Sequence, residues 1–229
     1  MFLDGYGQQI LAGTRLTIEL SVLSLLVAFV IGLVGAGGKI SRNYLIKALA
    51  TLYTTLIRGV PDLVLLLLIF YSLQIGLNHV TDALHMDQID LDPMTSGVLT
   101  LGFIYGAYFT ETFRGAFLSV PKGQIEAGTA YGLSHWQIFW RIQFPQMMRY
   151  ALPGIANNWQ VMLKATALVS IIGLVDVVQV SIDAGKSSYR VFFFTLVAAG
   201  VYLMLTTVSQ FILNGLEKHY SMGVREAEL

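Results

Sequence analysis

Long apolar runs alternate with short charged segments along this chain, and the pattern is typical of a membrane protein. A helix that crosses a bilayer needs roughly 20 mostly apolar residues. We therefore expect five spans, at about residues 16–37, 60–77, 95–113, 152–175 and 191–213. A segment of mixed character, residues 121–145, separates the third run from the fourth. The predicted fold class is all-α, with a single transmembrane domain over residues 1–229.

The composition agrees with this pattern. Of the 229 residues, 55% are hydrophobic and only 12% are charged, whereas soluble domains have about 25% charged residues. The formal net charge is zero, so no basic field indicates a nucleic-acid partner. The chain has no cysteine, which excludes disulfides, thiolate nucleophiles and cysteine-ligated metals. The first apolar run has no basic segment before it and no small-residue cleavage site after it, so we expect a retained span.

The basic residues predict the direction of insertion, because cytoplasmic loops carry an excess of Lys and Arg. An odd number of spans puts the two termini on opposite sides of the membrane. With the N-terminus outside, ten basic residues fall in the inner segments and three in the outer ones. The outer three are Arg15, Lys186 and Arg190. We therefore expect the N-terminus outside and the C-terminus inside.

The inner segment between the first two apolar runs has its own helical pattern. Leu45, Leu49, Leu52 and Leu56 recur at helical spacing. The pattern predicts a helix that lies along the membrane surface or against its neighbours, with Lys and Arg at the level of the lipid headgroups. A packed connector is the favoured interpretation, and a site for a specific lipid is the alternative.

Two glycines four residues apart occur in the third apolar run. Gly102 and Gly106 form a small-xxx-small spacing, which lets the backbones of two helices approach closely. We expect this spacing to mark a contact between membrane helices.

The segment between the third and fourth runs predicts two short helices rather than a span. Pro121 suits the start of the first helix, and Gly132 suits its end. Ser134 and Gln137 then form an S-x-x-Q capping box for a second helix, which we expect Pro145 to stop. A glycine between two helices leaves a corner without a side chain, and a partner surface can approach such a corner closely. By the orientation above, this corner faces the cytoplasm.

The order of residues in this segment resembles a known family. Glu126-Ala127-Gly128, three residues, Gly132, nine residues and then Ile-Gln-Phe-Pro at 142–145 is similar to the EAA loop of ABC-importer membrane subunits, whose pattern is E-A-A, three residues, G, nine residues, I-x-L-P. Gly128 and Phe144 replace the alanine and leucine of that pattern. The stretches "RGVPDLVLLLLIFY" and "YFTETFRGAFLSVPKGQ" resemble the polar amino acid permease group of the same family. The resemblance covers nearly the whole chain.

The resemblance implies a division of labour in a bacterial inner membrane. It implies a multi-pass subunit that forms half of a path for polar, cationic amino acids such as histidine, arginine, lysine or ornithine. Its implied partners are a homologous second membrane subunit, two cytoplasmic ATPase subunits that bind ATP and Mg²⁺, and a periplasmic amino-acid-binding protein. Glu126, Ala127, Gly128 and Gly132 would couple the path to the ATPase, and the chain itself would be no enzyme.

Two short segments look like nucleotide-binding loops but lack the required residues. Gly185-Lys186-Ser187 would need another glycine at position 180, which is Val180. Gly38-Lys39 is followed by Ile40 where Ser or Thr is required. We therefore expect no cofactor on this chain. The aspartates 87, 90 and 92 lack the glycine and closing glutamate of a calcium loop, so we expect no metal site.

The fourth run is the richest in polar residues, and such residues inside a span usually face an interior or a water-filled path. Asn158, Met162, Thr166 and Ser170 repeat every four residues, so we expect them to share one helix face that lines a translocation path. For each of these residues, a hydrogen bond to a neighbouring helix is an equally good interpretation. The resemblance implies a glutamate where this chain has Asn158, as in many relatives that carry cationic amino acids. The asparagine fits a path in which a sister subunit supplies the acid, and it also leaves neutral polar amino acids open as cargo.

Two other classes of function remain as alternatives. A self-sufficient channel or secondary transporter would favour inverted repeats and broken helices, and the chain has no convincing internal repeat. A structural membrane protein would not require the spacing of the coupling loop. The amino acid that is carried, and the choice between a heterodimer and a homodimer, stay open at this point.

Overall fold

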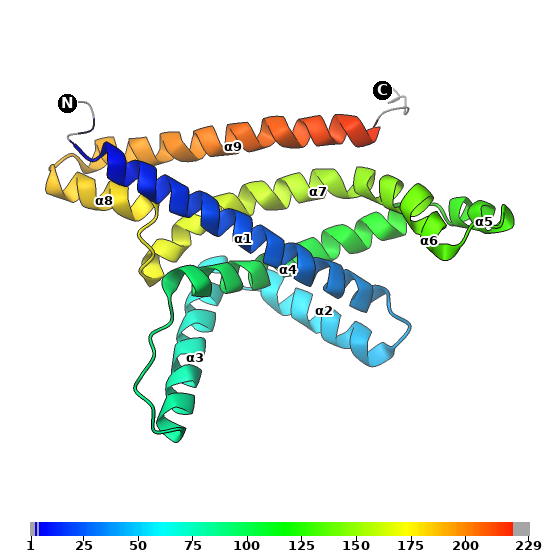
Figure 1. Ribbon diagram of the computed structural model, residues 1–229, viewed down its shortest axis with the longest axis horizontal. Helices are drawn as coiled ribbons and strands as arrows, with labels where there is room; N and C mark the ends of the chain where they lie inside the picture. Colours follow the sequence, from blue (N-terminus) through cyan, green and yellow to red (C-terminus); the bar gives the residue numbers. More distant parts are fainter. Residues whose placement is uncertain (1–2, 4, 222–229) are drawn as a thin grey trace.

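The computed structural model describes residue 3 and residues 5–221, and all regular elements in that part of the chain are helices. Four long helices lie along the longest axis of the molecule (Figure 1). These are α1 (Gly7–Ile40), α4 (Pro93–Ser119), α7 (Phe144–Ala165) and α9 (Val191–Ser221). The all-α class predicted from the sequence is confirmed.

Helix α4 is the centre of the bundle, and it packs most closely against α1. Glycines make this approach possible. A Cβ atom at Gly102 would lie 2.4 Å from Val27 Cγ1, and one at Gly106 would lie 2.6 Å from Ile31 Cγ2. Both distances are too short for real carbon atoms. The predicted role of this spacing in helix packing is confirmed.

Helix α2 (Tyr44–Gly59) runs back beside α1 and α4 (Figure 1). Asn43 starts it, because its side chain accepts hydrogen bonds from the amides of Leu45 and Ile46. Thr54 and Ile57 are buried against the neighbouring helices, while the leucines at 45, 49, 52 and 56 are all more than half exposed. The helix is therefore the packed connector that the sequence predicts, with an unpartnered apolar side.

Helix α3 (Asp62–Ala83) does not lie parallel to the other spans. It points away from the bundle, across the long axis of the molecule (Figure 1), and the helix that it contacts most is α4. Pro61 has an extended backbone and separates α3 from α2. The chain therefore returns from the end of α1 through α2 and then bends at Pro61 into α3, which covers the predicted span at 60–77.

Helix α4 begins directly after the acidic loop that follows α3. The Asp92 carboxylate accepts hydrogen bonds of 2.8 Å from the amide and hydroxyl of Thr95, and Pro93 occupies the first turn. These bonds hold the pKa of Asp92 below its ordinary value.

The predicted fourth span, 152–175, is not one continuous α-helix. Helix α7 begins earlier, at Phe144, and ends at Ala165. Residues Thr166–Ile172 then form the 3-10 helix η2, and Gly173 turns the chain with φ +100°. The hydroxyls of Thr166 and Ser170 donate to the carbonyls of Leu163 and Ala167. Asp176 caps the following helix, α8 (Val177–Ser187), through the amides of Val178 and Gln179.

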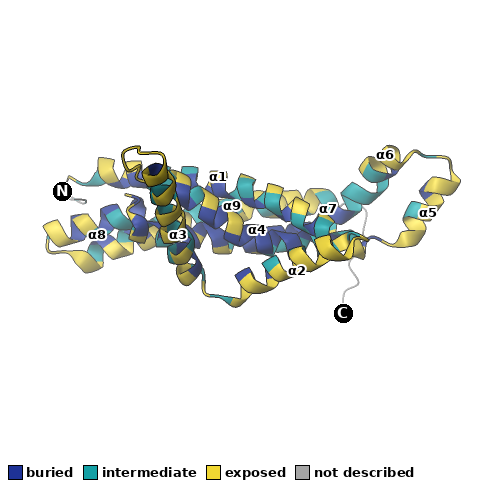
Figure 2. Ribbon diagram, turned by 90° about the horizontal axis from the view of Figure 1, so that it is seen from below, coloured by how far each residue is buried: buried dark blue, intermediate teal, exposed yellow. Residues whose placement is uncertain are grey.

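In the described part of the chain, three helices are long and apolar enough to cross a membrane by themselves: α1, α3 and α9. A fourth span results if the run from residue 135 to 172 is joined to α8 across a bend of 56°. Length and composition therefore support three to four of the five predicted spans. The start of α1 and the end of α9 lie at opposite ends of the molecule (Figure 1). The segment of residues 122–138 projects from the end of the molecule toward which the C-terminus of α9 points (Figures 1 and 2).

Candidate functional site

The projecting segment consists of two short helices, as the sequence predicts. Helix α5 (Lys122–Ala130) starts after Pro121, and helix α6 (His135–Ile138) follows a turn at Gly132 with φ +77°. The amide of Ser134 donates to Gln137 Oε1 at 2.9 Å, and the amide of Gln137 donates to Ser134 Oγ at 3.3 Å. The predicted capping box is therefore present. Both helices are largely exposed (Figure 2).

The four predicted coupling residues lie on two sides of this helix pair. Glu126 and Ala127 are exposed on α5, and Gly132 is exposed with open space where a Cβ would stand. Gly128 is buried instead, against Ile138 and Ile142. A side chain would not fit there, because a Cβ would lie 2.9 Å from Ile142 Cδ1 and 3.1 Å from Ile138 Cγ1. Three of the four residues are thus available to a partner, while Gly128 lets the two helices pack together.

Pro145 does not stop the second helix, which corrects the expectation from the sequence. The chain passes from α6 into a π-helical segment, η1 (Phe139–Gln143), and then into α7, where Pro145 lies in the first turn. A proline within a helical run has no N–H to donate and crowds the turn before it, and here the turn directly before it is the wider π-helical one. Residues 135–165 therefore form one continuous helical run.

Aromatic side chains line the start of this run. Trp136, Trp140 and Phe144 follow one another with ring centroids 5.5 and 5.0 Å apart, and Phe139 packs 5.2 Å from Trp140. Trp136 remains 69% exposed. Aromatic residues of this kind gather at the boundary between a membrane and water.

The predicted path residues do not share an open face in this structure. Asn158 is 8% exposed, and its Nδ2 donates to Thr112 Oγ1 of α4 at 3.0 Å. Met162 and Thr166 are fully buried, and the Thr166 hydroxyl lies 3.0 Å from the hydroxyl of Tyr202 on α9. Ser170 lies in the 3-10 helix, where a spacing of four residues no longer returns to the same side. The expectation of one continuous helical stripe through residue 170 is therefore wrong, and a role of these residues in a path stays a prediction.

The open side of α7 carries a different set of residues. Asn157, Val161 and Lys164 are exposed and follow one face of the helix at spacings of four and three. Tyr150 and Pro153 continue this face toward the projecting segment. The opposite sides of α7 pack against α4 and α9. The sequence signal was present, because Asn157 and Lys164 are polar residues in the same run, but periodicity alone did not show which face was free.

A charged cluster ties together three helices at the end where α1 stops. The Lys39 ammonium pairs with Glu111 of α4 and donates to Thr54 Oγ1 of α2 at 2.8 Å. The second oxygen of Glu111 accepts from Arg114 Nε at 2.9 Å. Glu111 therefore forms ion pairs with two cations. The side chains of Lys39 and Glu111 are mostly buried.

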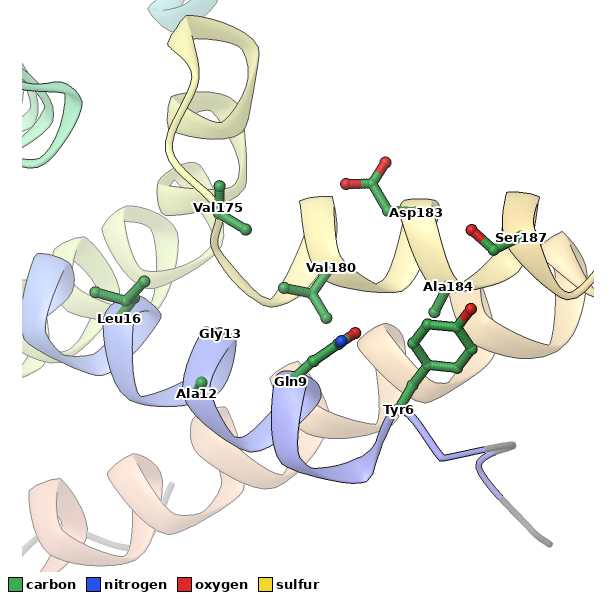
Figure 3. Close-up of a pocket in the computed structure, with 10 residues that line it drawn as sticks. All are labelled: Tyr6, Gln9, Ala12, Gly13, Leu16, Val175, Val180, Asp183, Ala184 and Ser187. Carbon is green, nitrogen blue, oxygen red and sulfur yellow. The ribbon is translucent and has the colours of Figure 1, made fainter.

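A pocket of about 430 Å³ lies at the opposite end of the molecule, between the start of α1 and the length of α8. Figure 3 shows Val180 and Ala184 of α8 facing Gln9 of α1 and Tyr6 just before it, while the Asp183 carboxylate points away from α1. The two helices meet closely at Gly13, where a Cβ would lie 2.9 Å from the carbonyl oxygen of Asp176. The pocket is thus an apolar groove with polar groups at its rim.

The segments that resemble nucleotide-binding loops lie inside helices. Gly185-Lys186-Ser187 forms the end of α8, and Gly38-Lys39 lies in the last turn of α1. In a nucleotide-binding loop these residues precede a helix and wrap a phosphate. In the described residues no group of three or more His, Cys, Asp or Glu side chains comes together.

Comparisons with known proteins agree with this arrangement. Residues 28–222 match the family described as "Binding-protein-dependent transport system inner membrane component". The chain is 61% identical over 227 residues to the histidine/lysine/arginine/ornithine transport system permease protein HisQ of Salmonella typhimurium, covering 99% of this chain and all of that protein. It is 37% identical to the octopine transport system permease protein OccQ of Rhizobium meliloti, covering 90% and 87% of the two chains. A crystal structure of an amino acid ABC transporter with histidines has a chain with a TM-score of 0.79 and 29% identity, covering 96% of this chain and 98% of that one.

Proposed function

This chain belongs to the family of inner membrane components of binding-protein-dependent transport systems, and we propose that it forms one half of the membrane path of an amino acid importer. The observation that carries this proposal is the exposed glycine corner between α5 and α6, placed at one end of a bundle whose sequence matches amino acid permeases over nearly its whole length. The chain is the membrane subunit, and ATP with Mg²⁺ binds to a separate ATPase.

The coupling loop would act as a rigid connection between the ATPase and the path. Glu126, Ala127 and the corner at Gly132 enter a groove on the ATPase surface. The helical run from 135 to 165 then passes any displacement of α6 directly to α7. No flexible loop separates the two, so a movement at the corner moves Asn157 and Lys164 on the open side of α7.

The open side of α7 faces the cargo path or the second membrane subunit. Asn157 offers a neutral amide, and Lys164 is an exposed cation with no acidic partner among the described residues. An exposed cation repels a cationic amino acid, and a buried ion left unpaired costs several kcal/mol. The acid that receives a cationic cargo therefore comes from a second, non-identical membrane subunit. The relative from Salmonella typhimurium, a permease for histidine, lysine, arginine and ornithine, supports cationic amino acids as the cargo class.

The membrane arrangement consists of five crossings in a bacterial inner membrane, with the N-terminus outside. The crossings are α1, α3, α4, α7 with η2, and α9. The excess of basic residues in the segments at the α5 end supports a cytoplasmic position for that end. A periplasmic amino-acid-binding protein then docks at the other end, where α8 and the start of α1 lie.

Co-purification with the candidate ATPase and a homologous membrane subunit tests this function. Mass spectrometry of the purified complex should find this chain, one non-identical membrane subunit and two ATPase subunits, and amino acid should stimulate ATP hydrolysis in the presence of the binding protein. Transport by this chain alone would instead support a self-sufficient channel or secondary transporter. A complex with two copies of this chain and no sister subunit would contradict the heterodimer.

A further inference from the structure

A basic pocket lies beside the charged cluster of Lys39, Glu111 and Arg114, at the end of the molecule that the proposed function places in the cytoplasm. It has a volume of about 310 Å³ and is lined by Lys39, Ile40, Lys47, Arg114 and Leu118. These residues come from the end of α1, the first turn of α2 and the end of α4. We propose that this pocket binds the phosphodiester headgroup of an anionic phospholipid of the inner leaflet.

The charge balance of the pocket favours an anion. Three cations line the pocket, and among the described residues the one carboxylate that pairs with any of them is Glu111, which gives a net charge of +2. Both oxygens of Glu111 are already occupied, one by Lys39 and one by Arg114. The side chain of Lys47 is exposed, and its ammonium forms no ion pair or hydrogen bond with a described residue. The Lys47 ammonium is therefore free to bind an acidic group from outside the chain.

The donors that remain suit a phosphate group. Arg114 binds Glu111 through its Nε atom. Its two terminal guanidinium nitrogens form no hydrogen bond with a described residue, so their N–H groups can bind another acceptor. Two parallel N–H donors of an arginine match two oxygens of a phosphate. Lys47 can approach the same group from α2 as a point charge.

The surroundings of the pocket distinguish a lipid from a soluble phosphate. Ile40 and Leu118 line the pocket and are 44% and 62% exposed. A second hollow of about 490 Å³ shares Lys47 and continues along one face of α2 past Ala48 and Leu52. A cationic hollow joined to a largely apolar groove along a helix has the shape of a headgroup followed by an acyl chain. Basic pockets between helices on the cytoplasmic side are typical places for anionic headgroups.

The assembled importer in nanodiscs of phosphatidylethanolamine, with and without added phosphatidylglycerol, tests this site. Native mass spectrometry would measure how much phosphatidylglycerol the complex retains. The Lys47→Ala variant should weaken retention about fivefold, as expected for the loss of one basic residue near the surface. The Arg42→Ala variant is the matched control, because Arg42 is exposed on the same side, just before α2, and does not line the pocket. It should retain phosphatidylglycerol like the wild type.

Three results would overturn the proposal. They are the absence of phosphatidylglycerol from the wild-type complex, equal losses in the two variants, and full displacement of the lipid by inorganic phosphate, which carries the same group without acyl chains. Amino-acid-stimulated ATP hydrolysis measured in the same samples separates this site from the proposed function. Stimulated hydrolysis without lipid retention would contradict the lipid site and leave the importer function standing. Lipid retention without stimulated hydrolysis would contradict the importer function and leave the lipid site standing.

Discussion

The side-chain amide of Asn158 on α7 donates a hydrogen bond of 3.0 Å to the hydroxyl of Thr112 on α4. The bond joins the helix that continues the coupling loop to the central helix of the bundle. Gly154 brings the same two helices together one turn earlier, because a Cβ there would lie 2.7 Å from Thr112 Cγ2. Any movement of α7 past α4 must therefore break or rearrange the contact between Asn158 and Thr112.

Substitution of Asn158 separates a structural role from a role in the path. Asn158→Leu and Thr112→Val both remove this hydrogen bond, and each should lower stability only slightly, because such bonds in membranes are worth about 0.6 kcal/mol. Asn158→Leu should also weaken transport or change its selectivity, since an amide can bind a polar cargo and leucine cannot. Initial uptake rates and melting temperatures of the two variants provide the comparison. Equal uptake losses in both variants would indicate a structural bond only.

The corner at Gly132 predicts an uncoupled variant. Gly132→Trp should keep ATP hydrolysis but lose uptake, because a bulky side chain fills the open corner that a partner approaches. The backbone at Gly132 has φ +77°, so any side chain also adds strain. Gly132→Asn controls for strain, because asparagine tolerates this conformation better than most residues. Asparagine should retain more uptake than tryptophan, and wild-type uptake in the tryptophan variant would contradict the role of the corner.

The contact between α1 and α4 predicts which glycines the fold requires. Gly102→Val should lower the free energy of unfolding by about 1–3 kcal/mol, the usual cost of extra bulk in a packed core, since even one carbon at this position would press on Val27. Gly115→Val is the matched control on the same helix, because a Cβ there meets nothing within 4 Å. Thermal unfolding in nanodiscs measures both variants. Equal losses would mean that the effect comes from helix propensity and not from packing.

The basic residues predict the topology. Reporter tags joined to the two ends of the chain should report opposite sides of the membrane, with the C-terminal tag in the cytoplasm, because ten of the basic residues lie in the segments assigned to that side and three in the outer ones. The start of α1 and the end of α9 lie at opposite ends of the molecule (Figure 1), which agrees with this result. Two cytoplasmic tags would rule out five crossings.

Local sequence signals predicted the coupling loop in detail. Pro121, Gly132 and the pair of Ser134 and Gln137 each act through the backbone of their own neighbourhood, and the structure has all three features where they were expected. The role of Gly102 and Gly106 in helix packing was also predictable, because a glycine lets two helix backbones approach closely wherever they meet.

Features that depend on distant contacts were not predictable from the pattern. The orientation of α3 across the bundle and the burial of Met162 depend on which helices pack together. The end of α7 at Ala165 and the change to a 3-10 helix at Thr166 leave no mark in the hydropathy of the run. Pro145 was expected to end a helix, yet a π-turn absorbs it. The free face of α7 could be recognised only after its neighbours were known.

Uptake of radiolabelled arginine and histidine into proteoliposomes is the measurement that tests the central claim most directly. The account predicts uptake only when this chain, a non-identical membrane subunit, the ATPase, the binding protein and ATP are all present. Omission of any one component should reduce uptake to the level of empty vesicles. Uptake by this chain alone, or uptake by the complete set that continues without ATP, would contradict the account.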